Sequence, residues 1–264
     1  MKKLGILGCG WLGTKLAVKL NSQKWNVKVS KTSIEGVISL GKQGIESYRI
    51  ILSENSIKGD LEFFENLDQL LISIPPKRDS IGNFSKKINY LINFLKSKSN
   101  TKIIFLSSTS VYGKRNGKFN EQSILFPDTD SSSNLVISEK MIQKSSNPSI
   151  IIRLGGLVGE DRNPIFHLNK KIITNPEGVI NFIHHIDAVN GIFKLLSCSQ
   201  AEGVYNLVSP HHPKRKDYYL KMAEKYSLSL PEFAENDPII IRLIEAKKIK
   251  TLTGFNYQVD NLLI

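Results

Sequence analysis

Three glycines near the start of the chain have the spacing of a loop that binds a diphosphate. Gly8, Gly10 and Gly13 follow the apolar run Lys3–Leu7 and open Trp11–Asn21, a stretch with helical spacing. In such a loop the first glycine makes the turn, the second lets a pyrophosphate approach the backbone, and the third allows close packing between helix and strand. The N–H groups at the start of the helix then bind phosphate oxygens. We therefore expect the following residues to contact a dinucleotide: Gly8, Gly10, Trp11, Leu12 and Gly13.

The residues after the next expected strand indicate which dinucleotide fits. About twenty positions past the loop stand Ser30, Lys31 and Thr32, and no carboxylate appears before Glu35. In NAD-binding proteins an acidic residue at this point binds the ribose 2′-hydroxyl. A lysine and hydroxyls instead suit a 2′-phosphate, which a carboxylate would repel. We predict NADP in preference to NAD; the alternative is that Lys31 is a solvent-exposed loop residue.

Three further segments carry recognisable motifs. Ser107–Gly113, Ser-Ser-Thr-Ser-Val-Tyr-Gly, follows the apolar run Lys102–Leu106, while Ile152–Gly159 and Phe182–Val189 come later in the chain. Together with the glycine loop, these segments resemble the extended short-chain dehydrogenase/reductase superfamily, which includes nucleotide-sugar epimerases and dehydratases. Their combination is also similar to the bacterial YeeZ-like group of atypical members.

This resemblance implies a fold, a cofactor position and a mechanism. The implied sheet has about seven parallel strands, with the cofactor across their carboxyl ends and the substrate in a C-terminal lobe. It adds the following cofactor-binding residues: Ile74, Pro75, Ser107, Leu154 and Gly155. In the superfamily a tyrosine is the acid and base, its pKa lowered by a lysine four residues later on the same helix face. A serine or threonine orients the substrate hydroxyl, and Ser108 matches that residue.

The tyrosine and lysine of the superfamily are missing from the helix expected after Pro127. If Glu139 is aligned with the acidic residue that usually follows the lysine, Ser132 stands at the tyrosine position and Val136 at the lysine position. Taking Lys140 as the lysine places Val136 at the tyrosine position, which still supplies no acid. The ordinary catalytic pair therefore cannot be assembled.

The catalytic candidates that remain are Ser108, Ser110 and Tyr112. Tyr112 is either a replacement acid or a ring that packs beneath the cofactor. His184 and Asp187 lie at the start of an expected helix, where Asp187 fits a capping or dipole role better than a catalytic one.

Basic and histidine residues supply the remaining candidates. Arg153, Arg162 and Lys170 are the basic groups expected to meet an anionic substrate, with surface charge as the alternative. His211 and His212 are adjacent and precede a proline, but no third ligand follows at metal-binding spacing. We expect no metal.

The elements that must position these residues alternate between strands and helices. Continuous apolar strands separated by amphipathic helices indicate a doubly wound, Rossmann-type parallel sheet in an α/β fold. The expected strands are Lys3–Leu7, Trp25–Ser30, Glu46–Ile51, Gln69–Ile74, Lys102–Leu106, Ser149–Leu154, Val179–Ile183 and Gly203–Val208. The expected helices are Trp11–Asn21, Phe84–Lys98, His185–Ser197, Asp217–Tyr226 and Ile240–Leu252. We predict a nucleotide-binding domain over residues 1–158 and a small substrate lobe over 159–264.

Composition restricts the class of partner. The 264 residues include 36 Lys and Arg against 24 Asp and Glu, a formal charge of +12. The lysines are spread along the chain without interleaved aromatic residues, so we expect no nucleic-acid partner. With only two cysteines a disulfide framework is excluded, and a reducing cytoplasm is the natural expectation. No apolar run approaches the about 20 residues of a membrane-spanning helix, and the N-terminal stretch does not resemble a signal peptide.

Two function hypotheses from different classes follow. The first is an NAD(P)-dependent oxidoreductase or epimerase-like enzyme that acts on a nucleotide-sugar or another small hydroxyl or carbonyl compound. The second is a non-enzymatic NADP(H)-binding sensor, which the missing tyrosine and lysine favour. The resemblance also implies a homodimer as the usual assembly. Steeply salt-dependent retention of DNA or RNA would instead revive nucleic-acid binding.

Overall fold

The computed structural model describes residues 1–76, 83–96, 100–168 and 171–264. Eight strands form its main sheet: β1 (Lys3–Leu7), β2 (Asn26–Lys31), β3 (Glu46–Leu52), β4 (Ile57–Gly59), β5 (Gln69–Ile72), β6 (Lys102–Ser108), β8 (Ser149–Leu154) and β11 (Gly203–Leu207). Their order is β11-β8-β6-β5-β1-β2-β3-β4. Without β4, which pairs antiparallel with β3, this is the strand order of a Rossmann fold. The structure confirms the predicted fold class, and the additional strand is the short edge strand β4.

The chain divides into two compact units that interleave along the sequence. The first comprises residues 1–107, 127–152 and 196–204, and the second comprises residues 108–126, 153–195 and 205–264. The predicted domains, residues 1–158 and 159–264, instead meet at a single boundary. That residues 1–158 and 159–264 are separate domains therefore stays a prediction.

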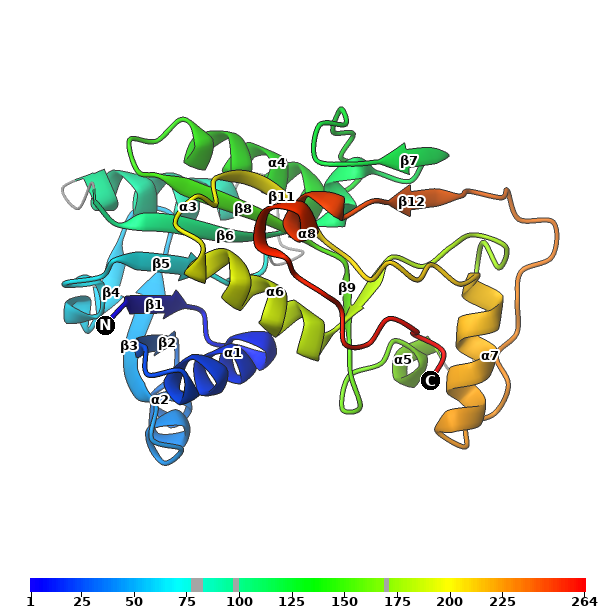
Figure 1. Ribbon diagram of the computed structural model, residues 1–264, viewed down its shortest axis with the longest axis horizontal. Helices are drawn as coiled ribbons and strands as arrows, with labels where there is room; N and C mark the ends of the chain where they lie inside the picture. Colours follow the sequence, from blue (N-terminus) through cyan, green and yellow to red (C-terminus); the bar gives the residue numbers. More distant parts are fainter. Residues whose placement is uncertain (77–82, 97–99, 169–170) are drawn as a thin grey trace. The chain divides into compact units, whose positions relative to one another are not determined.

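The first unit holds the glycine loop and most of the parallel sheet. Its helices are α1 (Trp11–Ser22), α2 (Ile34–Gly41), α3 (Asn83–Leu95) and α4 (Asp130–Gln143), with a short 3-10 helix η1 (Leu61–Phe64). Figure 1 shows α1 and α2 on one side of the strands and α3 and α4 on the other. This arrangement explains why four of the five residues of β1 are buried and why the strands have no polar face.

The described part of the second unit contains two small parallel strand pairs, four α-helices and the short 3-10 helix η3 (Thr109–Tyr112). The pairs are β9 (Gly156–Val158) with β10 (Phe182–His184), and β7 (Gly117–Phe119) with β12 (Arg242–Ile244). The helices are α5 (Ile165–Leu168), α6 (His185–Ser197), α7 (Arg215–Lys225) and α8 (Lys247–Thr253). A separate apolar cluster forms its core around Tyr218, Tyr219 and Met222 of α7, packed against Val158 and Ile165.

One expected element is wrong in its first half. The helix predicted over Ile240–Leu252 begins only at Lys247, because Arg242–Ile244 forms strand β12 and pairs with β7. Similarly, the strand expected over Val179–Ile183 lies at Phe182–His184. The end of the helix expected over Phe84–Lys98 reaches residues outside the described ones.

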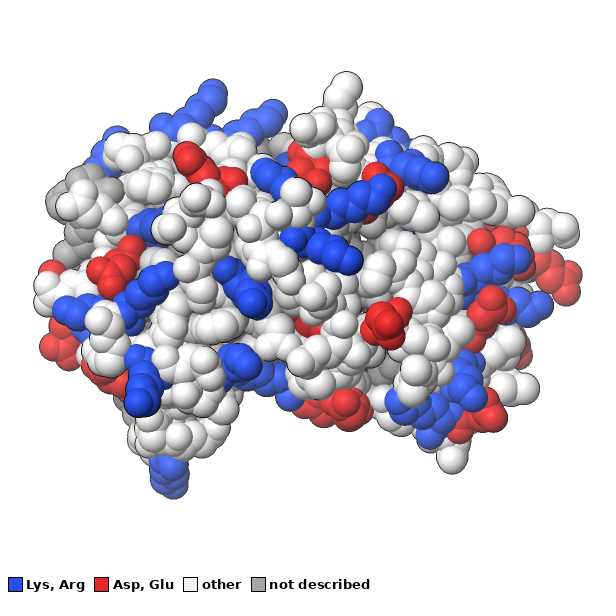
Figure 2. Space-filling view, viewed as in Figure 1, with Lys and Arg blue, Asp and Glu red and all other residues white. Residues whose placement is uncertain are grey.

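Charge is spread over the surface. On the face shown in Figure 2, lysine and arginine side chains alternate with acidic and uncharged ones and form no continuous basic area. This dispersed pattern agrees with the interpretation of the lysines as ordinary solvated residues. Within the described residues, none of the helices has the length and apolar character needed to span a membrane.

Candidate functional site

The glycine loop is fixed to the end of β2 by two hydrogen bonds. The N–H of Gly8 donates to the Ser30 hydroxyl at 3.0 Å, and the N–H of Cys9 donates to the Ser30 carbonyl at 2.9 Å. Gly8 has a φ of +90°, a conformation that favours glycine, and an added Cβ would lie 2.5 Å from Ile74 Cγ2. The first glycine therefore makes the tight turn that its position in the motif predicts.

The other two glycines leave room for different neighbours. A Cβ built on Gly10 meets no atom within 4 Å, whereas one built on Gly13 lies 3.4 Å from Ile6 Cγ2. Gly10 thus faces open space, and Gly13 lies where the helix packs against β1. This is the arrangement that a diphosphate approaching Gly10 requires.

Helix α1 begins directly after Gly10 without a side-chain cap or an acidic residue in its first turn. Its first residues are Trp11, Leu12 and Gly13, of which Leu12 and Gly13 are buried. These residues therefore offer backbone N–H groups rather than polar side chains. Uncapped N–H groups and the positive end of a helix form a binding site for an anion.

A pocket of about 570 Å³ opens beside this loop and joins seven of the predicted cofactor-binding residues: Gly8, Gly10, Ser30, Lys31, Thr32, Ile74 and Pro75. Residues that the sequence analysis did not single out complete it, among them Leu52, Ser73, Asn83, Phe84 and Lys87. Most of them follow the ends of β3 and β5 or begin α3. These residues could have been predicted from the expectation that a ligand of such a sheet binds at the carboxyl ends of neighbouring parallel strands.

The pocket is basic where the second strand ends. Lys31 and Lys87 line it, and no acidic residue is among the described residues that do. Arg49 of β3 adds a guanidinium nearby, since its Nε donates to the Thr32 carbonyl at 3.3 Å. Among the described residues that line the pocket, the charged ones are therefore both basic.

Ser107 of β6 and the residues Ser132 and Val136 of α4 make contacts that stabilise the first unit. The buried Ser107 hydroxyl donates to Glu139 Oε1 at 2.5 Å. Ser132, at the expected tyrosine position, is fully buried and forms a capping box with Thr129, and Val136 is buried as well. These positions pack and cap the helix.

The two serines expected to be catalytic, Ser108 and Ser110, lie in the second unit. Thr109–Tyr112 forms a single 3-10 turn, and the Ser108 hydroxyl accepts the N–H of Ser110 at 3.1 Å. Both serines are half-buried, so their hydroxyls are not sealed in the core. In this contact the Ser108 hydroxyl is the acceptor, and no hydrogen bond that it donates to another described residue is seen.

Tyr112, in contrast, is fully buried in a polar network of the second unit. Its hydroxyl donates to Oδ1 of Asn206 at 2.7 Å and accepts from Nη1 of Arg153 at 2.9 Å. Burial raises the pKa of the Tyr112 phenol, although Arg153 acts in the opposite direction. Of the two interpretations of Tyr112, this geometry favours a packed ring over a replacement acid.

The network also corrects the expectation for Arg153. This residue is only 4% exposed, and its guanidinium lies over the Tyr112 ring at 5.2 Å. Arg153 is therefore neither a surface charge nor placed to meet a substrate anion. Arg162 is exposed, and Lys170 lies outside the described residues.

The remaining predicted site residues, Leu154, Gly155 and Asp187, are packed or hydrogen-bonded within the second unit. Leu154 is buried, and Gly155 donates its N–H to Leu207 and lies so close to Asn181 that a Cβ would approach its carbonyl to 2.7 Å. The fully buried Asp187 accepts the backbone N–H groups of Gln258 and Val259 at 2.7 and 3.0 Å. Asp187 therefore holds the C-terminal segment against α6.

Comparison with solved structures defines the class of fold. UDP-glucuronic acid 4-epimerase from Bacillus cereus, solved in complex with NAD, aligns with a TM-score of 0.81 and 18% identity over 99% of this chain and 95% of that chain. A functionally unknown conserved protein from Silicibacter pomeroyi aligns with a TM-score of 0.81 and 21% identity over 100% and 96% of the two chains. The chain therefore shares the fold of these two proteins over nearly its whole length.

A closer relative is found at the level of sequence. Protein YeeZ from Escherichia coli K12 is 32% identical over 270 residues, which cover 100% of this chain and 98% of the relative. The chain belongs to the YeeZ family. No protein-family model matches it.

Proposed function

We propose that the chain binds NADP(H) in the pocket beside the glycine loop and acts as an oxidoreductase or epimerase-like enzyme on a nucleotide-sugar or another small hydroxyl or carbonyl compound. The observation that carries the proposal is the open space at Gly10 beside the uncapped start of α1. Such a cradle fits a diphosphate and has no packing role of its own.

The charge of the pocket supports NADP over NAD. Lys31 and Lys87 line it, and Arg49 contacts the Thr32 carbonyl. Basic side chains bind a 2′-phosphate through charge-assisted hydrogen bonds. The NAD in the Bacillus cereus epimerase supports a nicotinamide dinucleotide in general. The preference for NADP over NAD is argued only from the residues of the present chain.

The catalytic part of the proposal rests on the half-buried loop serines. A bound nicotinamide supplies or accepts a hydride, so the protein has to position the substrate and move a proton. Ser108 is proposed to orient the substrate hydroxyl, with Ser110 beside it, because its own hydroxyl remains able to donate. Tyr112 is given no proton-transfer role, since its hydroxyl is already bonded to Asn206 and Arg153.

A non-enzymatic NADP(H) sensor is the second candidate. The burial of Tyr112 favours this candidate. So do Ser132 and Val136 of α4, because they stand at the expected tyrosine and lysine positions and are buried, with Ser132 in the capping box of the helix. A protein of this kind would keep the cofactor pocket and lack turnover.

Binding and turnover separate these functions. The purified chain is titrated with NADPH, NADP, NADH and NAD while the unfolding temperature and the intrinsic tryptophan emission are followed; Trp11, the first residue of α1, contributes to this emission together with Trp25. It is then assayed with a panel of sugar nucleotides, aldehydes and ketones. Enzymatic function predicts turnover that Ser108→Ala reduces at least about 10²-fold without loss of cofactor binding.

The other outcomes have distinct meanings. Binding without turnover across the whole panel supports the sensor. Absence of binding by all four dinucleotides contradicts both candidates.

A further inference from the structure

A second constellation of ligand-type side chains lies in the second unit, away from the glycine loop in sequence. His184 ends strand β10, His185 begins helix α6, and Glu160 follows strand β9 by two residues. Because β9 and β10 are parallel with His184 opposite Val158, the loop that carries Glu160 continues past the two histidines. Sequence spacing alone does not reveal this cluster, since Glu160 is separated from His185 by 25 positions.

The three side chains converge on one point. His184 Nε2 lies 3.3 Å from Oε1 of Glu160, and His185 Nε2 lies 3.1 Å from Oε2. One ligand atom from each residue can be chosen so that all three lie within 4.8 Å of one another. The imidazole rings lie side by side, with centroids 4.6 Å apart, and their side chains are 13% and 15% exposed.

The distances match those between neighbouring ligands of a transition metal. Zn–N and Zn–O bonds of about 2.0–2.2 Å place adjacent ligand atoms of a tetrahedral site about 3.3–3.5 Å apart. The two observed nitrogen–oxygen distances are therefore within a small side-chain rotation of such a site. The 72% exposed Glu160 side chain has the freedom to make that rotation.

We propose that Glu160, His184 and His185 form a binding site for a divalent first-row transition cation such as Zn²⁺. Two imidazoles and one carboxylate are a ligand set found for zinc and for non-haem iron, and three protein ligands leave a further coordination position for an oxygen ligand. This inference goes beyond the proposed cofactor binding and differs from the expectation of no metal, which considered only His211 and His212.

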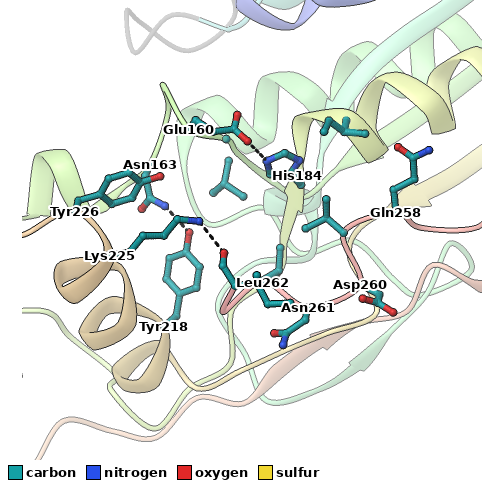
Figure 3. A pocket seen from close by; sticks show the side chains of 15 residues that line it. Glu160, Asn163, His184, Tyr218, Lys225, Tyr226, Gln258, Asp260, Asn261 and Leu262 are labelled. Carbon is teal, nitrogen blue, oxygen red and sulfur yellow. Dashed lines mark hydrogen bonds and ion pairs between the residues drawn. The ribbon is translucent and has the colours of Figure 1, made fainter.

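The open position faces a pocket. Glu160 and His184 line a cavity of about 310 Å³ together with Asn163, Tyr218 and Tyr226. Figure 3 shows Glu160 and His184 pointing toward each other at one side of this cavity. In the same cavity lining, the Asn163 amide donates to the Tyr218 hydroxyl at 2.8 Å. A ligand oxygen entering from the cavity would complete the coordination of the cation.

Metal binding by the full chain tests the proposal directly. After removal of any affinity tag and of bound metal by a chelator, the protein is titrated with Zn²⁺, with Fe²⁺ under anaerobic conditions, and with Mg²⁺. Bound metal is counted by mass spectrometry, and Co²⁺ serves as a spectroscopic probe of the ligand set. The expected result is one equivalent of Zn²⁺ or Fe²⁺, no retention of Mg²⁺, and a visible Co²⁺ spectrum typical of low coordination number.

Single substitutions assign the metal to these residues. Loss of a partner outside the ligand set typically costs about 10–100-fold in metal affinity, so Glu160→Gln, His184→Asn and His185→Asn should each weaken Zn²⁺ at least about 100-fold. Glu160→Gln is the most informative, because an exposed side chain can be changed without disturbing the fold. The matched control is His167→Asn, an exposed histidine in α5, which should leave the affinity unchanged.

Two results would overturn the proposal. One is failure of the wild-type chain to retain an equivalent of Zn²⁺ or Fe²⁺ after dialysis. The other is an affinity of Glu160→Gln and of both histidine variants equal to that of the control. In either case the three side chains serve only as a hydrogen-bonded contact between the loop after β9 and the start of α6.

Discussion

The N–H of Gly8 donates a 3.0 Å hydrogen bond to the hydroxyl of Ser30, so the turn after the first strand is held by the end of the second. Ser30 is only 2% exposed, and its oxygen is occupied in this contact. This contact fixes the shape of the glycine loop. Lys31 and Thr32, which follow Ser30, line the same pocket and are the residues proposed to contact the ribose end of a dinucleotide.

A methyl group at Gly10 should weaken dinucleotide binding without weakening the fold. Gly10 has φ −86° and ψ −154°, a conformation open to alanine, and its added Cβ would contact no protein atom within 4 Å. The methyl would occupy the space proposed for the diphosphate. We expect Gly10→Ala to bind NADPH at least about 10-fold more weakly, a loss of about 1.4 kcal/mol, with an unchanged unfolding temperature.

Calorimetric titration and thermal unfolding measure the two effects. Gly41→Ala is a matched control, because Gly41 lies at the end of α2 and its added Cβ makes only one contact, at 3.9 Å. Equal affinities of Gly10→Ala, Gly41→Ala and the wild type would show that the diphosphate does not approach Gly10.

Removal of the Lys31 charge should reduce binding of NADP far more than binding of NAD. The two dinucleotides differ only in the 2′-phosphate, and a hydrogen bond to a charged group contributes about 1.5–3 kcal/mol. Lys31→Ala is therefore expected to weaken NADP about 10–100-fold and to leave NAD within a factor of about three. Dissociation constants at two salt concentrations measure this, since an ionic contact weakens as salt rises.

Lys42→Ala controls for the general loss of positive charge, because Lys42 is exposed at the end of α2. A parallel loss of both dinucleotides in Lys31→Ala would argue against a 2′-phosphate at this position. So would equal effects of the Lys31 and Lys42 substitutions.

Tyr112→Phe is expected to destabilise the protein rather than to remove a catalytic acid. The substitution deletes the hydroxyl that joins Asn206 and Arg153, and removes one hydrogen-bond partner from each of these buried residues. The cost of such a loss is about 1–3 kcal/mol in the free energy of unfolding. Urea denaturation measures it, and any turnover found for the wild type should survive at temperatures where the variant is folded.

Tyr90→Phe is the comparison, since Tyr90 is half-buried on α3 and its hydroxyl has no hydrogen bond to a described residue. It should change stability by less than about 0.5 kcal/mol. If Tyr112→Phe had wild-type stability and no turnover, Tyr112 would have to be returned to the catalytic groups.

The parallel sheet and the glycine loop could be predicted from sequence because their determinants are local. Strands such as Ser149–Leu154 are buried on both faces and appear as continuous apolar runs, and the structure gives this strand the predicted bounds. The motif at Gly8, Gly10 and Gly13 predicted three different environments, and each glycine has the expected one.

Features that depend on distant partners could not be predicted in this way. Residues 242–244 look like part of a helix until β7, more than a hundred positions earlier, pairs with them. Arg153 looks like a basic group for a substrate, but its position is set by Tyr112, 41 residues away. Glu160 and the two histidines are joined only when β9 and β10 pair. Local pattern therefore gives the scaffold, and the buried polar contacts require the fold.

His212 should make the protein less stable as the pH falls below neutrality. Its Nδ1 lies 3.1 Å from the Ile180 carbonyl, and burial lowers its pKa below the ordinary value of 6.5 despite that contact. Between the folded pKa and 6.5 the unfolded chain binds more protons than the folded one, so the free energy of unfolding rises with pH in this window. The stability that neutral His212 contributes is lost as the pH falls through 6.5 toward the folded pKa, and below the folded pKa this contribution is fully lost.

Denaturant unfolding measured between about pH 5 and pH 7.5 tests this prediction. The free energy of unfolding should depend less steeply on pH in His212→Asn than in the wild type. The exposed His167→Asn should keep the wild-type slope, and an unchanged slope in His212→Asn would mean that this imidazole titrates alike in the folded and unfolded chains.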